Sequence, residues 1–144
     1  EILGNLLELF QSLAQEKGMT LESRLLKDVT VKGDAIQLSR LFRNLLENAL
    51  HYTPAGGKVM LTMKREDRSV IFLVADTGIG IAPEHLSFIF DRFWRADKAR
   101  SRRQSGMGMG LSIVRAIAQR HHGAVTATSQ LGVGSCFRVR LPLN

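Results

Sequence analysis

The chain has 144 residues and a net charge of +7, with 44% hydrophobic and 23% charged residues. This length and composition are those of one globular domain with a hydrophobic core of its own. No apolar run approaches the roughly 20 residues that span a bilayer, and no secretory signal pattern opens the chain. The single cysteine excludes an internal disulfide. The sequence opens in mid-helix without an initiator Met, so we expect a fragment of a longer protein.

The first third of the chain predicts two helices joined by short strands. Apolar residues recur at helical spacing through residues 1–17. Alternating stretches at 20–26 and 29–32 predict strands. A second helix begins at Asp34, a good N-cap, with Gln37 three residues on as a capping-box partner.

This second helix is strongly amphipathic. Its apolar residues follow an i, i+3, i+4, i+7 pattern and are Leu38, Leu41, Phe42, Leu45, Leu46, Ala49 and Leu50. The opposite face is polar and carries Arg40, Arg43, Asn44, Glu47, Asn48 and His51. The helix should therefore cover a core with one face and expose the other.

Two strands and a short helix are predicted next. Residues 58–65 alternate between apolar and polar, whereas 69–75 is apolar on both sides, as a central strand should be. A proline near its start predicts a short helix over 83–90. The basic stretch 91–105 has little apolar periodicity and is predicted to be a long loop.

The last part of the chain predicts one helix and a strand pair. The helix opens in the glycine-rich run 106–110, and Gly123 ends it. Two strands at 124–129 and 135–141 follow, joined by a glycine-containing turn. The whole order predicts an α+β fold, a two-layer α/β sandwich with a mixed, mostly antiparallel sheet of about five strands covered on one face by about three helices.

The positive charge is concentrated in the predicted loop. Between Asp91 and Gln104, six basic residues stand against two acidic ones, a net charge of +4. The stretch has no interleaved aromatic platform of the kind that single-stranded nucleic-acid binders use. A local phosphate partner therefore explains the charge better than a long polyanion, and we predict no nucleic-acid partner.

Four residues near the end of the second helix could bind a nucleotide. Asn44, Asn48, His51 and Tyr52 share one helix face by their spacing. An Asn oxygen can ligate Mg²⁺ without adding charge, leaving phosphate oxygens as the anionic ligands. His51 could donate to a phosphate, and Tyr52 could pack on a base. Polar residues on such a helix are also commonly just solvent-facing, and the helix alone leaves both readings open.

Two glycine motifs could complete a nucleotide site. Asp76 ends the central strand and is followed by Gly78 and Gly80, so its carboxylate could read an amine such as that of adenine while the glycines admit a flat ring. The same D-T-G sequence is also ordinary turn chemistry. The alternating glycines of 106–110 at a helix start resemble a phosphate cradle. They are neither a P-loop nor a Rossmann fingerprint.

Taken in order, these elements closely resemble the sequence boxes of sensor histidine kinases, members of the GHKL superfamily. The run 44–54 (NLLENALHYTP) resembles the N box, and 76–80 (DTGIG) the first glycine box. The run 90–95 (FDRFWR) looks like the phenylalanine box, with Trp94 where Tyr is commoner. The run 106–111 (GMGMGL) is similar to the second glycine box, although Met107 and Met109 replace a small residue and Leu.

The resemblance implies a set of nucleotide-binding residues. Asn48 should hold Mg²⁺ with Asn44 beside it, and Asp76 should accept from the adenine amino group. The expected ATP contacts are Asn44, Asn48, His51, Tyr52, Asp76, Gly78, Gly80, Arg92, Arg95, Gly106, Gly108, Gly110 and Leu111, of which Asn44, Asn48, Arg92 and Arg95 would be catalytic. A mobile ATP lid would occupy about 91–107.

The resemblance also implies the reaction and the partners. The chain should be the ATP-binding catalytic domain of a two-component sensor histidine kinase. It should transfer the ATP γ-phosphoryl group to a histidine of a dimerisation domain absent from this chain, and through that domain serve a response regulator. Residues 1–18 would be the end of the dimerisation helix and a linker, and 19–144 the catalytic domain. We expect the cytoplasmic domain of a membrane-anchored receptor, without membrane contact by this fragment.

The fragment itself lacks an acceptor. No His-Glu phosphoacceptor motif occurs, and we interpret His85, His121 and His122 as structural or surface residues. The fragment is therefore expected to bind Mg-ATP without autophosphorylation.

Three alternatives remain at this point. A hydrolase resembling gyrase or the heat-shock chaperone ATPases would carry a Glu one turn before the Mg²⁺-binding Asn, where this chain has Asn44, and a carboxamide is a poor general base. An anti-sigma serine kinase shares the fold, but the opening helix and the phenylalanine box favour a histidine kinase. A non-enzymatic basic binding module would bind polyanions without nucleotide selectivity.

Overall fold

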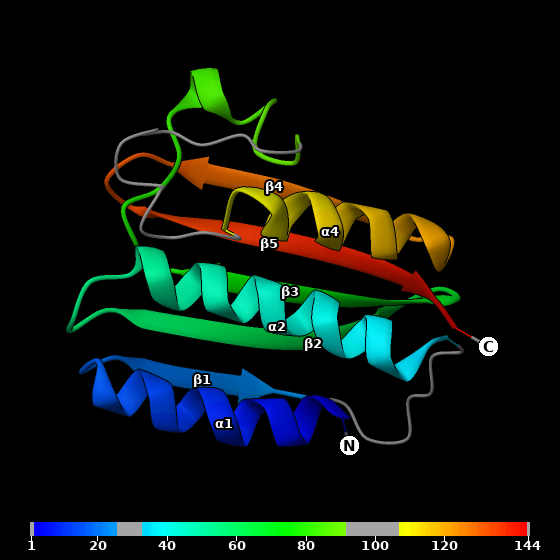
Figure 1. The fold of residues 1–144 in the computed structure, drawn as a ribbon, viewed down its shortest axis with the longest axis horizontal. Coiled ribbons are helices and arrows are strands. Elements are labelled where there is room, and N and C mark those ends of the chain that lie inside the picture. The colour runs from blue at the N-terminus through cyan, green and yellow to red at the C-terminus, as the bar shows by residue number, and fades with distance from the viewer. Residues whose placement is uncertain (1, 26–32, 92–106, 144) are drawn as a thin grey trace.

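The computed structural model describes residues 2–25, 33–91 and 107–143. The helices α1 (Ile2–Glu16), α2 (Ala35–Tyr52) and α4 (Met107–Arg120) lie on one face of a five-stranded sheet (Figure 1). The strands are β1 (Thr20–Arg24), β2 (Lys58–Glu66), β3 (Ser69–Asp76), β4 (Ala124–Gln130) and β5 (Gly134–Pro142).

The sheet is mixed and mostly antiparallel. Its strand order is β1-β2-β3-β5-β4, and the pair β1 and β2 is parallel whereas the other neighbours are antiparallel. The predicted fold class is confirmed, and the strand predicted to be central is the third of five. The strand predicted at 29–32 and residues 92–106 of the predicted lid lie outside the described residues.

One hydrophobic core joins the helices to the sheet. Alternate residues of the strands, such as Val59 and Leu61 of β2, face the buried stripes of the helices. The α2 stripe is buried as the sequence predicts, and its buried residues are Leu41, Phe42, Leu45, Leu46, Ala49 and Leu50.

Helix α1 belongs to this same core. Five of its residues are buried in it: Leu3, Leu6, Leu7, Phe10 and Ala14. The apolar stripe of α1 is buried together with α2 and β1. The division predicted at residue 18 stays a prediction, as does the origin of α1 in a dimerisation helix.

The start of α2 is capped as predicted, with one difference. The Oδ1 atom of Asp34 accepts from the backbone N–H groups of Ile36 at 2.9 Å and Gln37 at 3.2 Å. The N–H of Asp34 donates to Nε2 of His121 at 3.0 Å, not to a Gln37 side chain. The second half of the predicted capping box is therefore replaced by a contact with the end of α4.

Two other predicted details are wrong. The segment 83–90 is not an α-helix: a single 3₁₀ turn at Pro83–His85 is followed by turns whose N–H groups bond three residues back, as in Phe88 to His85. Helix α4 ends through His122, which takes the left-handed conformation at φ 62°. Gly123 is needed for a different reason, because a Cβ there would collide with the carbonyl oxygen of Arg140 in β5.

We predict that Asp34→Ala lowers the free energy of unfolding by about 1 kcal/mol, because two N–H groups of α2 lose their acceptor. Urea unfolding would measure it. Asp34→Asn, which keeps an acceptor oxygen, should stay close to the wild type. Equal stability of the Ala and wild-type proteins would show that the cap contributes nothing.

Candidate functional site

The C-terminal half of α2 presents the four predicted polar residues beside the core. Asn44, Asn48 and His51 are half-buried, and Tyr52 is 38% exposed. The rings of His51 and Tyr52 meet edge to face, with centroids 4.6 Å apart and planes at 88°. The helix ends at Thr53, whose hydroxyl donates to the Ala49 carbonyl at 2.7 Å. Helix geometry therefore places these side chains along one side of the last turns of α2.

The loop after β3 is hydrogen-bonded to the start of β2 and to the end of α2. The N–H of Thr77 donates to the Lys58 carbonyl at 3.0 Å, and the N–H of Lys58 donates to the Thr77 hydroxyl at 2.9 Å. The N–H of Ile79 donates to the Tyr52 carbonyl at 3.1 Å. The loop that carries Asp76 is thus held against the end of α2.

Glycine is required at two positions of this loop. A Cβ on Gly78 would collide with the Tyr52 carbonyl oxygen and lie 2.9 Å from Oδ1 of Asp76. Gly80 has φ 75°, and a Cβ there would collide with the carbonyl oxygen of Gln130 in β4. The two glycines allow the loop to pass between α2 and the β4–β5 turn.

Asp76 is the half-buried acid of the site. Its Oδ1 accepts from the N–H groups of Gly78 at 2.9 Å and Ser135 at 3.3 Å. Burial raises the pKa of this carboxyl above its ordinary value, and these two hydrogen bonds oppose the rise. Both bonds end on Oδ1, so Oδ2 is the oxygen left for an amine of a ligand.

Asn44 meets the start of α4. A Cβ on Gly110 would lie 3.8 Å from Oδ1 of Asn44, an ordinary contact distance, so the two helices approach closely at this point. The Nδ2 group of Asn44 is buried and has no hydrogen-bond partner among the described residues. A buried donor without an acceptor costs about 1–3 kcal/mol, which favours an acceptor supplied by a ligand.

The same residues fit a magnesium-nucleotide complex. The described part of the chain contains no group of three or more His, Cys, Asp or Glu that could hold a metal by itself. Mg²⁺ prefers oxygen ligands and commonly shares them with substrate phosphates. The amide oxygens of Asn44 and Asn48, one turn apart on α2, are suitable neutral donors, and a phosphate oxygen would also be an acceptor for Asn44 Nδ2.

The remaining predicted residues divide into two groups. Gly108 and Gly110 lie in the first turn of α4, and Leu111 is half-buried against the core. Arg92, Arg95 and Gly106 lie outside the described residues. Ser135, whose N–H donates to Asp76, was not predicted from the sequence. Its position opposite Asp76 comes from the pairing of β3 with β5, which no local pattern gives.

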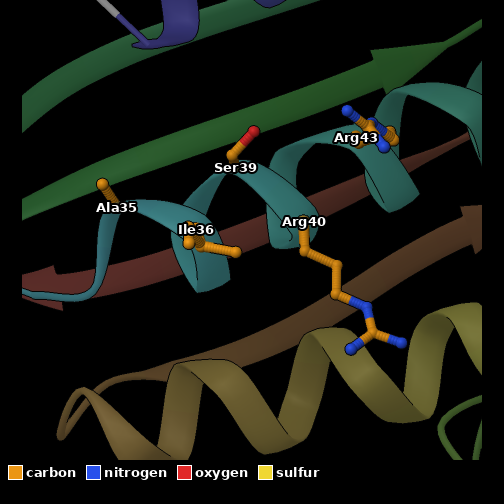
Figure 2. Close-up of a pocket in the computed structure, with 5 residues that line it drawn as sticks. All are labelled: Ala35, Ile36, Ser39, Arg40 and Arg43. Carbon is orange, nitrogen blue, oxygen red and sulfur yellow. The ribbon is translucent and has the colours of Figure 1, made fainter.

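A hollow of about 460 Å³ on the first half of α2 is a different place (Figure 2). Its described lining consists of Ala35, Ile36, Ser39, Arg40 and Arg43, and Ile36 is 82% exposed. None of the predicted nucleotide residues that the structure describes lines it. The polar half of α2 lies at the other end of the helix, beside the Asp76 loop and the start of α4, on the left in Figure 1.

A one-sided helical layer on a mixed sheet, with a half-buried acid and glycine turns at one end, defines a nucleotide-binding α/β sandwich. Residues 33–144 match the family of histidine kinase-, DNA gyrase B- and HSP90-like ATPases. The chain belongs to this family and is an ATP-binding catalytic domain of the histidine-kinase type.

Relatives and solved structures agree with this assignment. The chain is 42% identical over 144 residues to the sensor histidine kinase RppB of a Synechocystis species, covering 99% of this chain and 32% of that protein. The mycobacterial sensor histidine kinase MprB superposes with a TM-score of 0.82 at 27% identity, covering 99% of this chain and 94% of that one. Full-length ShkA in complex with AMPPNP superposes with a TM-score of 0.84 at 33% identity, covering 99% of this chain and 29% of that one.

The chain therefore spans about a third of the length of the curated relative RppB. Among residues 2–25, 33–91 and 107–143, no helix has the length and apolar character that a membrane crossing requires.

We predict that Asp76→Asn weakens nucleotide binding without destabilising the domain at neutral pH. The amide would present a donor where the ligand amine needs an acceptor, and loss of a hydrogen bond to a charged group corresponds to about tenfold to hundredfold in affinity. Because burial raises the pKa of Asp76, the folded state favours the protonated acid, and ionisation of this carboxyl lowers the stability of the fold.

The raised pKa of Asp76 also fixes the direction in which stability changes with pH. The contribution of Asp76 to stability is fully present below its unfolded-state pKa and is lost as the pH rises through the higher folded-state pKa. The stability of the Asn variant relative to the wild type should therefore rise with pH in the acid range and then level off. Urea unfolding of both proteins between pH 3 and 7 measures the difference. A relative stability that falls with pH would contradict the burial argument.

Proposed function

We propose that this domain binds Mg-ATP and transfers its γ-phosphoryl group to a histidine on a dimerisation domain outside the chain. The observation that carries the proposal is the polar side of α2. It joins the Asp76 loop at Tyr52 and places Asn44 beside the start of α4, where the buried Nδ2 of Asn44 has no hydrogen-bond partner in the described part of the chain. Residues 44 and 52 are about 12 Å apart along the helix, a span suited to an extended nucleotide.

The base end of the nucleotide would lie at Asp76. Its Oδ2 would accept from the adenine amino group, while Gly78 leaves room for the ring and Tyr52 lies beside it. The phosphates would lie along α2 toward Asn48 and Asn44, with His51 as a further donor. Arg92, Arg95 and the glycines at 106, 108 and 110 are proposed contacts on the family resemblance alone.

The chemistry expected of this domain is positioning and charge stabilisation. In the transfer, the acceptor histidine nitrogen forms a bond to the γ-phosphorus while the bond from that phosphorus to the bridging oxygen breaks, and ADP leaves with the electron pair. Bound Mg²⁺ would supply charge neutralisation on the phosphates. Asn44, Asn48 and His51 would hold the phosphate chain in one orientation, which is how a site without a nucleophile of its own lowers a barrier.

Hydrolysis is the disfavoured alternative. A water molecule needs a base to activate it, and the residue one turn before Asn48 is the amide Asn44. The relatives named as sensor histidine kinases favour the kinase over the ATPase and serine-kinase alternatives. We further propose that the parent protein is a membrane-anchored receptor with this domain in the cytoplasm, acting on a response regulator through its dimerisation domain.

We predict that Mg-ATP binds the domain at one site per chain and that Asn48→Ala weakens this binding by about tenfold or more, since an amide ligand is lost. Isothermal titration calorimetry measures both affinities. Arg40→Ala is the matched control, because Arg40 lies on the same helix but lines the separate hollow of Figure 2. Failure of the wild type to bind, or equal weakening by both variants, would refute the site.

The isolated domain should not label itself. Incubation with γ-³²P-ATP is expected to give no acid-labile phosphoprotein, because its four histidines are not in a phosphoacceptor motif. Adding the dimerisation domain of the same receptor should produce the label, and Asn48→Ala should suppress it. Label on the isolated domain, or steady release of inorganic phosphate without a partner, would favour a different reaction.

A further inference from the structure

His121 joins the end of α4 to the start of α2. Its Nε2 accepts from the backbone N–H of Asp34 at 3.0 Å, and its Nδ1 lies 2.8 Å from the carbonyl oxygen of Ile117. A carbonyl only accepts and a backbone N–H only donates, so the ring carries its proton on Nδ1 and is bare on Nε2. One neutral tautomer of His121 therefore satisfies both helices at once.

The chain leaves room for this ring at Gly33. A Cβ on Gly33 would collide with Cδ2 and Nε2 of His121 and would lie 3.2 Å from Leu38. The contact thus depends on a glycine before α2 as well as on the histidine after α4. The ring is fixed from three sides, by Gly33, Asp34 and the last turn of α4.

The contact lies at the far end of the helix pair that forms the site. Helices α2 and α4 run in opposite directions over the sheet (Figure 1), so Gly110 meets Asn44 at one end and His121 meets Asp34 at the other. The two contacts are about 15 Å apart along α2 and about 16 Å apart along α4, at 1.5 Å per residue. The two spans match, so a slip of α4 along α2 would break the hydrogen bond between His121 and Asp34 and move Gly110 away from Asn44.

The packing between these two contacts is apolar. Val114, Ile117 and Ala118 of α4 are buried in the core that the α2 stripe also enters. Apolar burial is strong but non-directional, so it does not by itself select one axial position of a helix. A hydrogen bond with fixed geometry can select one axial position. The ring of His121, just after α4, makes such a bond with the backbone N–H of Asp34, the N-cap of α2.

We propose that His121 is a positioning residue that fixes the axial register of α4 against α2 and thereby holds Gly110 opposite Asn44. Its effect on nucleotide affinity rests on the function proposed above. Its effect on the structure of the helix pair does not.

The first test compares His121→Leu with His121→Gln and with the control Gln119→Leu, an exposed residue in the last turn of α4. His121→Leu should weaken Mg-ATP binding by about threefold to tenfold, the range of one neutral hydrogen bond. His121→Gln should restore affinity, since its Oε1 can accept from the Asp34 N–H. The control should bind as the wild type does.

The second test reads the helix pair without nucleotide. In ¹⁵N-resolved NMR spectra, the Gly110 amide and the Asn44 side-chain amide should shift in His121→Leu and stay in place in Gln119→Leu. A purely local role at the end of α4 would leave these distant signals unmoved. Gly33→Ala should displace the His121 ring and so reproduce the shifts. Gly4→Ala is its control, because a methyl added there meets nothing within 4 Å.

The outcomes are separable. If the wild type fails to bind ATP, the proposed function is wrong, but the NMR shifts still test whether His121 fixes the position of α4 along α2. If the wild type binds and His121→Leu binds equally well with unmoved Gly110 and Asn44 signals, the positioning role is wrong. If His121→Leu does not fold, Gly33→Ala and the double variant Gly33→Ala/His121→Gln decide, because a shared contact predicts that their effects do not add.

Discussion

Helix α2 has to satisfy two requirements at once, and the arrangement of the molecule follows from them. One face supplies six buried residues to the core, and the other supplies the polar residues of the site. The Asp76 loop attaches to its C-terminal carbonyl at Tyr52, and α4 faces it at Asn44. Because core and site share one rigid helix, positions at the site are set by the same packing that stabilises the fold.

This coupling explains why the site can keep groups that oppose stability. Burial raises the pKa of Asp76, and the Asn44 amide is buried without an acceptor among the described residues. Each is unfavourable in the absence of a ligand, and each becomes favourable when a ligand supplies the complementary group. A nucleotide with an amine at one end and phosphate oxygens at the other would complement both, and its binding would then also stabilise the site.

The sequence predicted most of what depends on local pattern. The α2 stripe, the Asp34 cap and the central position of β3 were visible from periodicity and cap chemistry. It could not show contacts between distant segments. The partner of the Asp34 N–H is His121, 87 residues away, so a local capping box was predicted in its place. The holding of Asp76 by Ser135 likewise follows from strand register, which depends on the assembled sheet.

Glycines illustrate the same limit. Gly123 was interpreted as a helix stop, which is the usual local reason for a glycine there, yet the left-handed residue is His122 and Gly123 lies against β5. The burial of α1 was missed for a related reason: its stripe was recognised, but a stripe does not name the surface that it packs against. Local sequence patterns identify helices and strands, whereas the surface that each one packs against is set by tertiary contacts.

The chemistry proposed for the domain depends on what surrounds the expected position of the phosphates. The residue one turn before Asn48 is the amide Asn44, which can orient a phosphate but does not take a proton from water. A site that binds and orients the nucleotide with an amide at this position would hold the γ-phosphoryl group in place without transferring it to water. The group that attacks must then come from elsewhere and bring its own nucleophilicity, as an imidazole nitrogen does. Transfer would therefore be governed by the docking of the partner domain, which is the property that a signalling kinase requires and a free-running ATPase lacks.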